Sequence, residues 1–147
     1  MNNLSKSQAG NQTQNHIHAL RVYWEDTDAA GIVYYANYLK YTERARSEIL
    51  YAAGIDQTEM RETGGVVLAV RACNTEYHLP ARLGDQLEVH TAVIAVKGAS
   101  FELRQTVMRG IDALVVMDVR LACIDPISGK PARLPAQIKA VLSGTKV

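Results

Sequence analysis

The feature that most constrains the fold is one long amphipathic helix followed by segments that read almost entirely as strands. Within Arg21 to Gly54, apolar side chains recur every three or four residues and share one helix face, namely Tyr38, Tyr41, Ala45, Ile49 and Ala52. The pattern predicts a helix that begins between Tyr34 and Asn37 and ends before Gly54, because glycine adopts the positive φ of a helix end at no steric cost. A helix of about 17 residues is ~25 Å long. The rest of the chain must therefore cover it.

The segments around this helix alternate apolar and polar residues, as strands do. The predicted strands are His18 to Trp24, Val66 to Leu79, Leu87 to Val96, Ser100 to Met108 and Ala113 to Ile124. Short turns join the last four strands, and short turns require antiparallel neighbours. The sequence thus predicts an α+β domain in which the long helix lies across a five-stranded antiparallel sheet. A connector with a short helical turn is expected at Ile55 to Gly65, and a C-terminal helix at Ala136 to Leu142.

The chain length fits a single domain. At 147 residues it can build one core but not two. The first 16 residues are polar and rich in Asn, Gln and Ser, which predicts a disordered tail over residues 1–16 and a folded domain over residues 17–143. An unpaired sheet edge invites pairing with a second copy, so a homodimer or homotetramer is expected.

Charge and composition exclude several classes of partner. The formal net charge is +1 and no basic block occurs, so the sequence offers no case for nucleic acid or a membrane surface. No apolar stretch reaches the ~18 residues of a membrane-spanning helix, and no signal peptide is visible, which favours the cytoplasm. Cys73 and Cys123 lie in apolar strands and are expected to be buried thiols, with a disulfide between neighbouring strands left open. No metal-ligand spacing occurs.

The loop EDTDAAG between the first strand and the helix contains two carboxylates, Asp26 and Asp28. Acidic residues in such loops often cap helices or face solvent, and a divalent cation is a second interpretation. A third interpretation is catalytic. The free N–H groups at a helix start stabilise a developing oxyanion, and a carboxylate held nearby by a turn at Gly31 could act as nucleophile or general base.

The segment RVYWEDTDAAGIVYYANYLKYTERARSEIL resembles the signature of the 4-hydroxybenzoyl-CoA thioesterase family, and most closely its branch of bacterial acyl-CoA thioesterases associated with the Tol–Pal envelope system. The similarity extends over roughly Leu20 to Arg133 in the order and spacing of elements. It implies the hotdog fold, in which an antiparallel sheet wraps the long helix. It also implies hydrolysis of acyl-CoA thioesters, with a short-chain aliphatic or aromatic acyl group and no cofactor.

The resemblance assigns roles to residues of the loop. The family's catalytic aspartate is the second acid of its D-x-D-x-x-G motif, which is Asp28 here, while Asp26 orders the loop. The backbone N–H of Tyr35 polarises the thioester carbonyl, and Gly31 permits close approach of the backbone to the substrate. Many members of the Tol–Pal branch have a histidine at the position of Tyr35. This departure leaves hydrolysis through a backbone donor in place but argues against a histidine-assisted mechanism.

The resemblance also suggests residues that bind the rest of the substrate. Lys97 and Ser100 flank the Gly98 turn in a segment where family members contact coenzyme A, whose phosphates attract cations. The weaker candidates for this contact are Arg71, Arg82 and Arg104. Tyr34, together with Tyr35, could line a tunnel for the acyl group, whereas Tyr38 and Tyr41 are expected in the core or at a dimer interface.

Two other functional classes remain open. One is a non-catalytic hotdog protein that binds an acyl thioester or acyl carrier protein and is linked to the Tol–Pal system. The other is a dehydratase, which typically uses a histidine near the helix start, and none lies between Arg21 and Tyr77. Acyl carrier protein is also open as the thiol carrier of a hydrolase.

Overall fold

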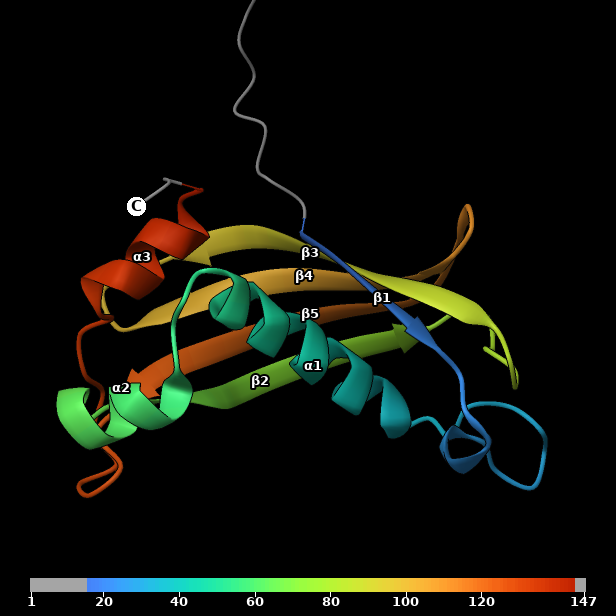
Figure 1. The fold of residues 1–147 in the computed structure, drawn as a ribbon, viewed down its shortest axis with the longest axis horizontal. Coiled ribbons are helices and arrows are strands. Elements are labelled where there is room, and N and C mark those ends of the chain that lie inside the picture. Colours follow the sequence, from blue (N-terminus) through green and yellow to red (C-terminus); the bar gives the residue numbers. More distant parts are fainter. Residues whose placement is uncertain (1–15, 145–147) are drawn as a thin grey trace, which may run out of the picture.

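The computed structural model describes residues 16–144 of the chain. Figure 1 shows β1 (His16–Arg21), the single turn η1 (Trp24–Asp26), α1 (Asn37–Ala52), α2 (Gln57–Gly64), β2 (Val67–Tyr77), β3 (Gln86–Val96), β4 (Ser100–Arg109), β5 (Asp112–Ile124) and α3 (Ala136–Leu142). The expected tail over residues 1–16 lies outside the described residues, apart from His16, which begins β1. The predicted α+β class is confirmed.

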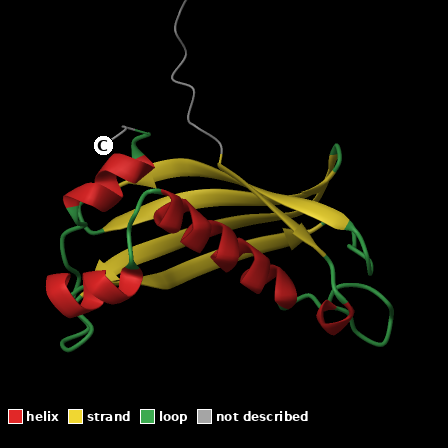
Figure 2. Ribbon diagram, in the orientation of Figure 1, coloured by secondary structure: helices red, strands yellow, loops and turns green. Residues whose placement is uncertain are grey.

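The five strands form one antiparallel sheet in the order β1-β3-β4-β5-β2. β3, β4 and β5 are neighbours joined by short turns, as predicted. The expected pairing of β2 with β3 is wrong, because β2 lies on the outer side of β5, with Val67 opposite Ile124 and Tyr77 opposite Val115. β1 and β2 are therefore the two edge strands, and β2 is the longer of them. The sheet is curved, and all three helices lie on its inner side (Figure 2).

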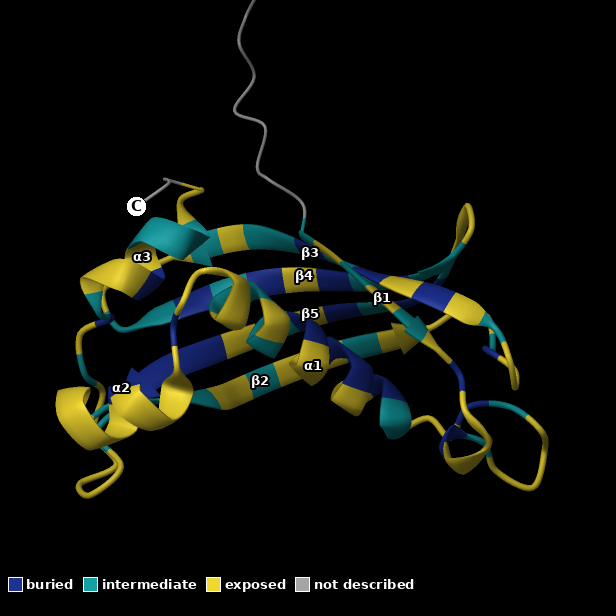
Figure 3. Cartoon of the chain, in the orientation of Figure 1, coloured by how far each residue is buried: buried dark blue, intermediate teal, exposed yellow. Residues whose placement is uncertain are grey.

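Helix α1 crosses the inner face of the sheet and is buried most deeply in its first half (Figure 3). Tyr38, Tyr41 and Ala45 are buried, as their spacing predicts, while Ile49 is only partly buried and Ala52 is exposed. The helix ends as expected, because Gly54 follows it with a φ of 75°.

The core consists of two clusters under different parts of the helices. One cluster packs around the first half of α1 and includes Val22, Leu87 and Leu114. The other lies at the far end of the sheet, where α2 and α3 cover Phe101 and Leu121. The second half of α1 runs between them.

Two local predictions are wrong. Trp24 does not continue the first strand, because a hydrogen bond from the N–H of Tyr23 to Oδ2 of Asp26 turns the chain into η1, where Trp24 is 79% exposed. Cys73 is exposed rather than buried, since it lies on the edge strand β2, which α1 does not cover. Cys123 is buried as predicted, and burial raises the pKa of its thiol. Both cysteines are free thiols.

A buried polar contact joins α1 to the sheet. Gln105 of β4 is fully buried, and its Nε2 donates to the backbone oxygen of Thr42 at 2.9 Å and to Oγ1 of Thr91 at 3.0 Å. Its Oε1 accepts a hydrogen bond of 2.9 Å from the guanidinium of Arg46. This side chain therefore connects the middle of α1 to β3 and β4.

We predict that Gln105→Leu destabilises the protein by about 1–3 kcal/mol, because an isosteric apolar side chain leaves buried partners of the amide unsatisfied. Urea unfolding followed by circular dichroism measures the change. Thr106→Val is the control, since residue 106 is the next on β4 and points to the other face of the sheet, and a shift of less than about 0.5 kcal/mol is expected there. Equal midpoints for Gln105→Leu and wild type would contradict the prediction.

Candidate active site

The loop between η1 and α1 is held by Asp26. This aspartate is buried, and its Oδ2 accepts the 2.7 Å hydrogen bond from Tyr23. Its backbone oxygen accepts from the N–H of Tyr34 at 2.9 Å and from Nδ2 of Asn37 at 2.8 Å. One residue thus ties the start of the loop to the first residue of α1, which agrees with the loop-ordering role expected for Asp26.

Asp28 lies in the same loop and is exposed. Its Oδ1 accepts a hydrogen bond of 2.8 Å from the N–H of Ala30, and its backbone oxygen accepts from the N–H of Gly31 at 3.0 Å. Gly31 has a φ of 78°, which a residue with a side chain rarely adopts, so glycine is needed for this turn. The turn presents the Asp28 carboxylate to solvent with its second oxygen unengaged by any described residue.

The loop is also tied to the segment that follows β2. Ile32 forms a β-bridge with Arg82, and the backbone N–H of Arg82 donates to Oδ2 of Asp85 at 2.9 Å. Arg109 of β4 donates to the same oxygen at 2.8 Å. Partial burial opposes ionisation of Asp85, but these hydrogen bonds outweigh it and lower the pKa of the carboxyl group. The segment between β2 and β3, together with Arg109 of β4, therefore supports the position of Ile32.

Tyr35 lies two residues before α1 and offers a backbone donor. Its N–H makes no hydrogen bond to any described residue, and its side chain is 62% exposed. Its carbonyl oxygen accepts a hydrogen bond of 3.1 Å from the hydroxyl of Tyr77 at the end of β2. An unpaired N–H at the positive end of a helix is the type of donor that stabilises an oxyanion.

Aromatic side chains surround this donor. The rings of Tyr35 and Tyr77 meet edge to face with centroids 6.2 Å apart, and Tyr34 packs against Tyr35 at 5.0 Å. The hydroxyl of the buried Tyr38 accepts a hydrogen bond of 3.0 Å from the N–H of Ala81. Tyr35, Tyr38 and Tyr77 border a hollow of about 300 Å³ between the start of α1 and the end of β2. Burial raises the pKa of Tyr38 and of Tyr77, so both hydroxyls stay protonated at neutral pH.

The structure does not bring Lys97 and Ser100 to this loop within one chain. They form the turn between β3 and β4, where the N–H of Lys97 donates to the oxygen of Ser100 at 2.7 Å. This turn packs beside α3, at the opposite end of the sheet from Asp28 (Figure 1). Among the weaker candidates, Arg82 lies beside the loop. Arg104 forms a two-bond ion pair with Asp118 on the outer face of the sheet, and Arg71 is exposed on β2.

Residues 16–144 contain no group of three or more His, Cys, Asp or Glu side chains placed to hold a metal ion. Within the same residues, no helix is long and apolar enough to cross a bilayer.

The geometry thus consists of an exposed carboxylate in an ordered loop and a free N–H at the start of the long helix. Residues 22–142 match the family model of the thioesterase-like superfamily. The chain belongs to the thioesterase-like superfamily. Its fold is the hotdog fold, as the resemblance implied, and its predicted membership of a thioesterase family is confirmed.

Individual members of this superfamily are similar over most of their length. The acyl-CoA thioester hydrolase YbgC of Escherichia coli is 38% identical over 122 residues, which are 82% of this chain and 90% of that protein. The acyl-CoA thioesterase YbgC of Haemophilus influenzae is 39% identical over 127 residues, 86% of this chain and 93% of that protein. The crystal structure of a probable thioesterase from Bartonella henselae matches with a TM-score of 0.78 and 35% identity, covering 83% of this chain and all of that one.

Sequence reasoning missed Tyr77 as part of the site of this superfamily member. Tyr77 is 42 residues from Tyr35, and the order of strands alone does not say which of them ends beside the helix start. The sequence did show that Tyr77 lies near the end of the strand before Pro80, with its aromatic ring on the same strand face as Thr75. This alternation predicts the face of the strand on which Tyr77 lies but not its contact with Tyr35.

We predict that replacing Asp26 destabilises the protein more than replacing Asp28. Asp26→Ala removes a buried acceptor and leaves the Tyr23 N–H unpaired, so it should destabilise the protein by about 1–3 kcal/mol. Asp28→Ala removes only an exposed turn contact and should cost less than about 1 kcal/mol. Thermal unfolding of the two variants beside wild type measures both. A larger loss for Asp28→Ala than for Asp26→Ala would refute the assignment of loop ordering to Asp26.

Proposed function

We propose that this chain hydrolyses acyl-CoA thioesters to the free acid and coenzyme A. The observation that carries the proposal is the unpaired N–H of Tyr35 at the start of α1, next to a loop that presents the Asp28 carboxylate. The YbgC relatives, whose names state acyl-CoA thioester hydrolysis, support it.

Two routes use the same groups. In the first, the Asp28 carboxylate attacks the thioester carbonyl, the C–S bond breaks, and coenzyme A leaves as the thiolate. Water then hydrolyses the mixed anhydride, which restores the Asp28 carboxylate, releases the acid and supplies the proton that the thiolate takes up. In the second, Asp28 accepts a proton from water as that water attacks the carbonyl, the C–S bond breaks, and the proton passes from Asp28 to the departing thiolate. In both routes negative charge develops on the carbonyl oxygen, where the Tyr35 N–H and the helix dipole stabilise it. The donor is a backbone group, so the mechanism does not require the histidine that many relatives have there.

The substrate preference follows from the surroundings of the donor. Tyr35 and Tyr77 border the hollow beside the helix start, and Tyr34 packs against Tyr35. Such rings favour a short aliphatic or aromatic acyl group. Acyl carrier protein is the second possible thiol carrier. The alternative function is non-catalytic binding of an acyl thioester or acyl carrier protein linked to the Tol–Pal system, which would leave Asp28 without a chemical role. The cytoplasmic location stays a prediction.

We further propose that two copies pair through their β2 edges, in a dimer or in a tetramer built from it. β2 has an unpaired edge, and Val70 and Tyr77 on its inner side are about half exposed. Antiparallel pairing of two β2 strands would place the Tyr77 end of one copy at the same end of the joined sheet as the Gly98 turn of the other. In this arrangement, Lys97 and Ser100 of one copy would lie at the end of the sheet that carries the other copy's candidate active site, where they could bind coenzyme A.

We predict that Asp28→Asn lowers kcat by at least about 100-fold, because the amide is neither a general base nor an effective nucleophile. Release of free thiol from a panel of short-chain, long-chain and aromatic acyl-CoAs gives the rate and the preferred acyl class. Melting temperature and oligomer size should not change. Tyr35→Phe is the matched control, since it keeps the backbone donor and should retain wild-type turnover.

The outcomes separate the alternatives. Equal rates for wild type and Asp28→Asn would remove Asp28 from the mechanism. No turnover by wild type on any thioester, including acyl carrier protein thioesters, would favour the binding function. Loss of turnover in Tyr35→Phe would show that the phenol, rather than the backbone, is needed.

Tyr77 gives a separate prediction, because it touches Tyr35 and not the reacting atoms. Tyr77→Phe keeps the ring contact but loses the hydrogen bond to the Tyr35 carbonyl, so the peptide that carries the donor is held less firmly. We expect kcat to fall by about tenfold, which corresponds to roughly 1.4 kcal/mol, while KM changes little. A rise in KM at constant kcat would instead assign Tyr77 to substrate binding.

A further inference from the structure

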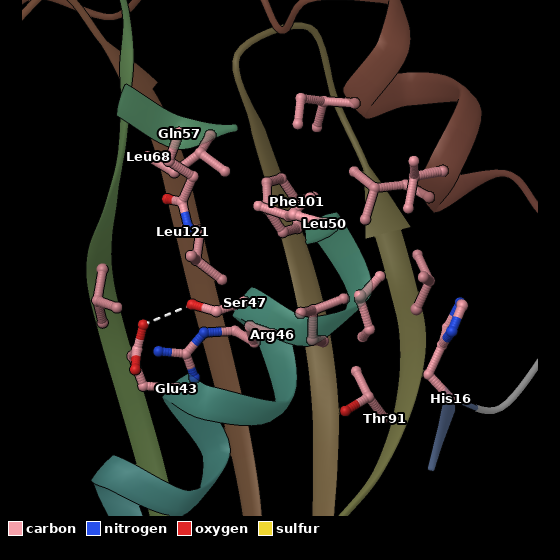
Figure 4. Close-up of a pocket in the computed structure, with 17 residues that line it drawn as sticks. His16, Glu43, Arg46, Ser47, Leu50, Gln57, Leu68, Thr91, Phe101 and Leu121 are labelled. Atoms are coloured by element: carbon pink, nitrogen blue, oxygen red, sulfur yellow. Dashed lines mark hydrogen bonds between the residues drawn. The ribbon is translucent and has the colours of Figure 1, made fainter. Parts of the chain in front are cut away.

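A second cavity lies at the other end of α1. It is enclosed between the second half of α1, the inner face of the sheet, α2 and α3, and has a volume of about 170 Å³ (Figure 4). Its walls are mainly apolar and include Leu50, Leu68, Phe101, Leu103, Leu121 and Ile138. In another protein, an engineered cavity of about 150 Å³ with Leu, Ile and Phe walls binds benzene. The cavity therefore has room for one aromatic ring or a chain on the order of six carbons.

The rim of this cavity carries a cation, Arg46 of α1 (Figure 4). The guanidinium is oriented by its hydrogen bond to Gln105, whose own amide is fixed by Thr42 and Thr91. It is thus a preorganised group rather than a mobile surface side chain. We call the cavity together with this side chain the Arg46 cavity.

Among the described residues, no carboxylate forms an ion pair with Arg46, although Glu43 also lines the cavity. Glu43 accepts instead from the hydroxyl of Ser47 at 2.7 Å. Burial lowers the pKa of Arg46, with Glu43 acting in the opposite direction. A partly desolvated cation costs free energy unless an anion pairs with it. The rim therefore offers unused donors to an anion.

We propose that the Arg46 cavity binds a short aliphatic or aromatic carboxylate, with the carboxylate on the guanidinium and the apolar part inside. A guanidinium matches the planar geometry of a carboxylate, and the apolar walls exclude anions that carry no apolar group. This choice of ligand rests on the proposed function, because such a carboxylate is the acid that hydrolysis of an acyl-CoA thioester releases. The thioester substrate has no charge at its carbonyl and would not pair with Arg46.

The Arg46 cavity is separate from the Asp28 loop of the same chain. Arg46 follows Tyr35 by eleven residues, and at 1.5 Å per residue this is ~16 Å along the helix. A six-carbon acid seated at Arg46 cannot reach the Tyr35 N–H of its own chain. Binding at the two places can therefore be distinguished by mutation.

The test is a calorimetric titration of the full chain with hexanoate. Hexan-1-ol, which lacks the charge, and sulfate, which lacks the apolar chain, are the comparison ligands. We expect saturable binding of hexanoate to wild type, and at least tenfold weaker binding of both comparison ligands. Asp28→Asn should bind hexanoate with the wild-type Kd, because the site does not use the loop. This readout needs no turnover, so it stands apart from success or failure of the proposed hydrolysis.

Variants assign the binding to the cavity. Arg46→Met keeps the apolar stem without the charge and should weaken hexanoate binding at least tenfold, while Arg44→Met, on the exposed side of the same helix, should not change it. Leu50→Phe fills the cavity and keeps the cation, and it should also weaken binding, which covers the case that Arg46→Met fails to fold. No saturable binding by wild type, unchanged affinity in both Arg46→Met and Leu50→Phe, or loss of binding in Asp28→Asn alone would overturn the proposal.

Discussion

The arrangement of this molecule depends on the packing of the first half of α1 against the curved sheet. Tyr38 and Tyr41 fill the space between helix and strands, and the Tyr38 hydroxyl is anchored by the N–H of Ala81 in the segment after β2. Large aromatic side chains contribute the most apolar area per residue to such a core. Because this end of the helix is anchored, its first backbone groups have a defined position relative to the loop that carries Asp28.

The second half of α1 is packed differently from the first half, so the two ends of the helix offer different chemical groups. Beyond Ala45 the helix no longer presents fully buried side chains, and the space beneath it remains as the Arg46 cavity, which is lined by members of the second core cluster. Gln105 and Arg46 bridge this space with hydrogen bonds instead of apolar contact. One end of the helix thus offers a free N–H and the other a preorganised cation.

Much of the fold could be predicted from the sequence, because its signals are local. The 3.6-residue period of α1, the alternation of the strands, the short turns after β3 and β4, and Gly54 each depend on neighbours in the chain. The motif around Asp28 was likewise visible, since its residues are consecutive. The contact of Tyr77 with Tyr35, the exposure of Cys73 and the bond of Arg46 to Gln105 were not. Each depends on which strand lies at the sheet edge or under the helix, and periodicity does not fix that order.

Because β2 is an edge strand, part of the candidate active site of one chain is exposed to solvent. Its inner face carries Val70, Cys73 and Tyr77, which pair with buried residues of β5 but are themselves exposed at the edge of the sheet. Tyr77 nevertheless holds the Tyr35 carbonyl, so the position of the Tyr35 N–H, the donor proposed above, depends on this edge strand. Any contact that orders the β2 edge would also order the donor, since the hydroxyl of Tyr77 connects the two. Pairing of two β2 edges would therefore act on the chemistry through this one hydrogen bond, without any residue of the partner having to touch the thioester.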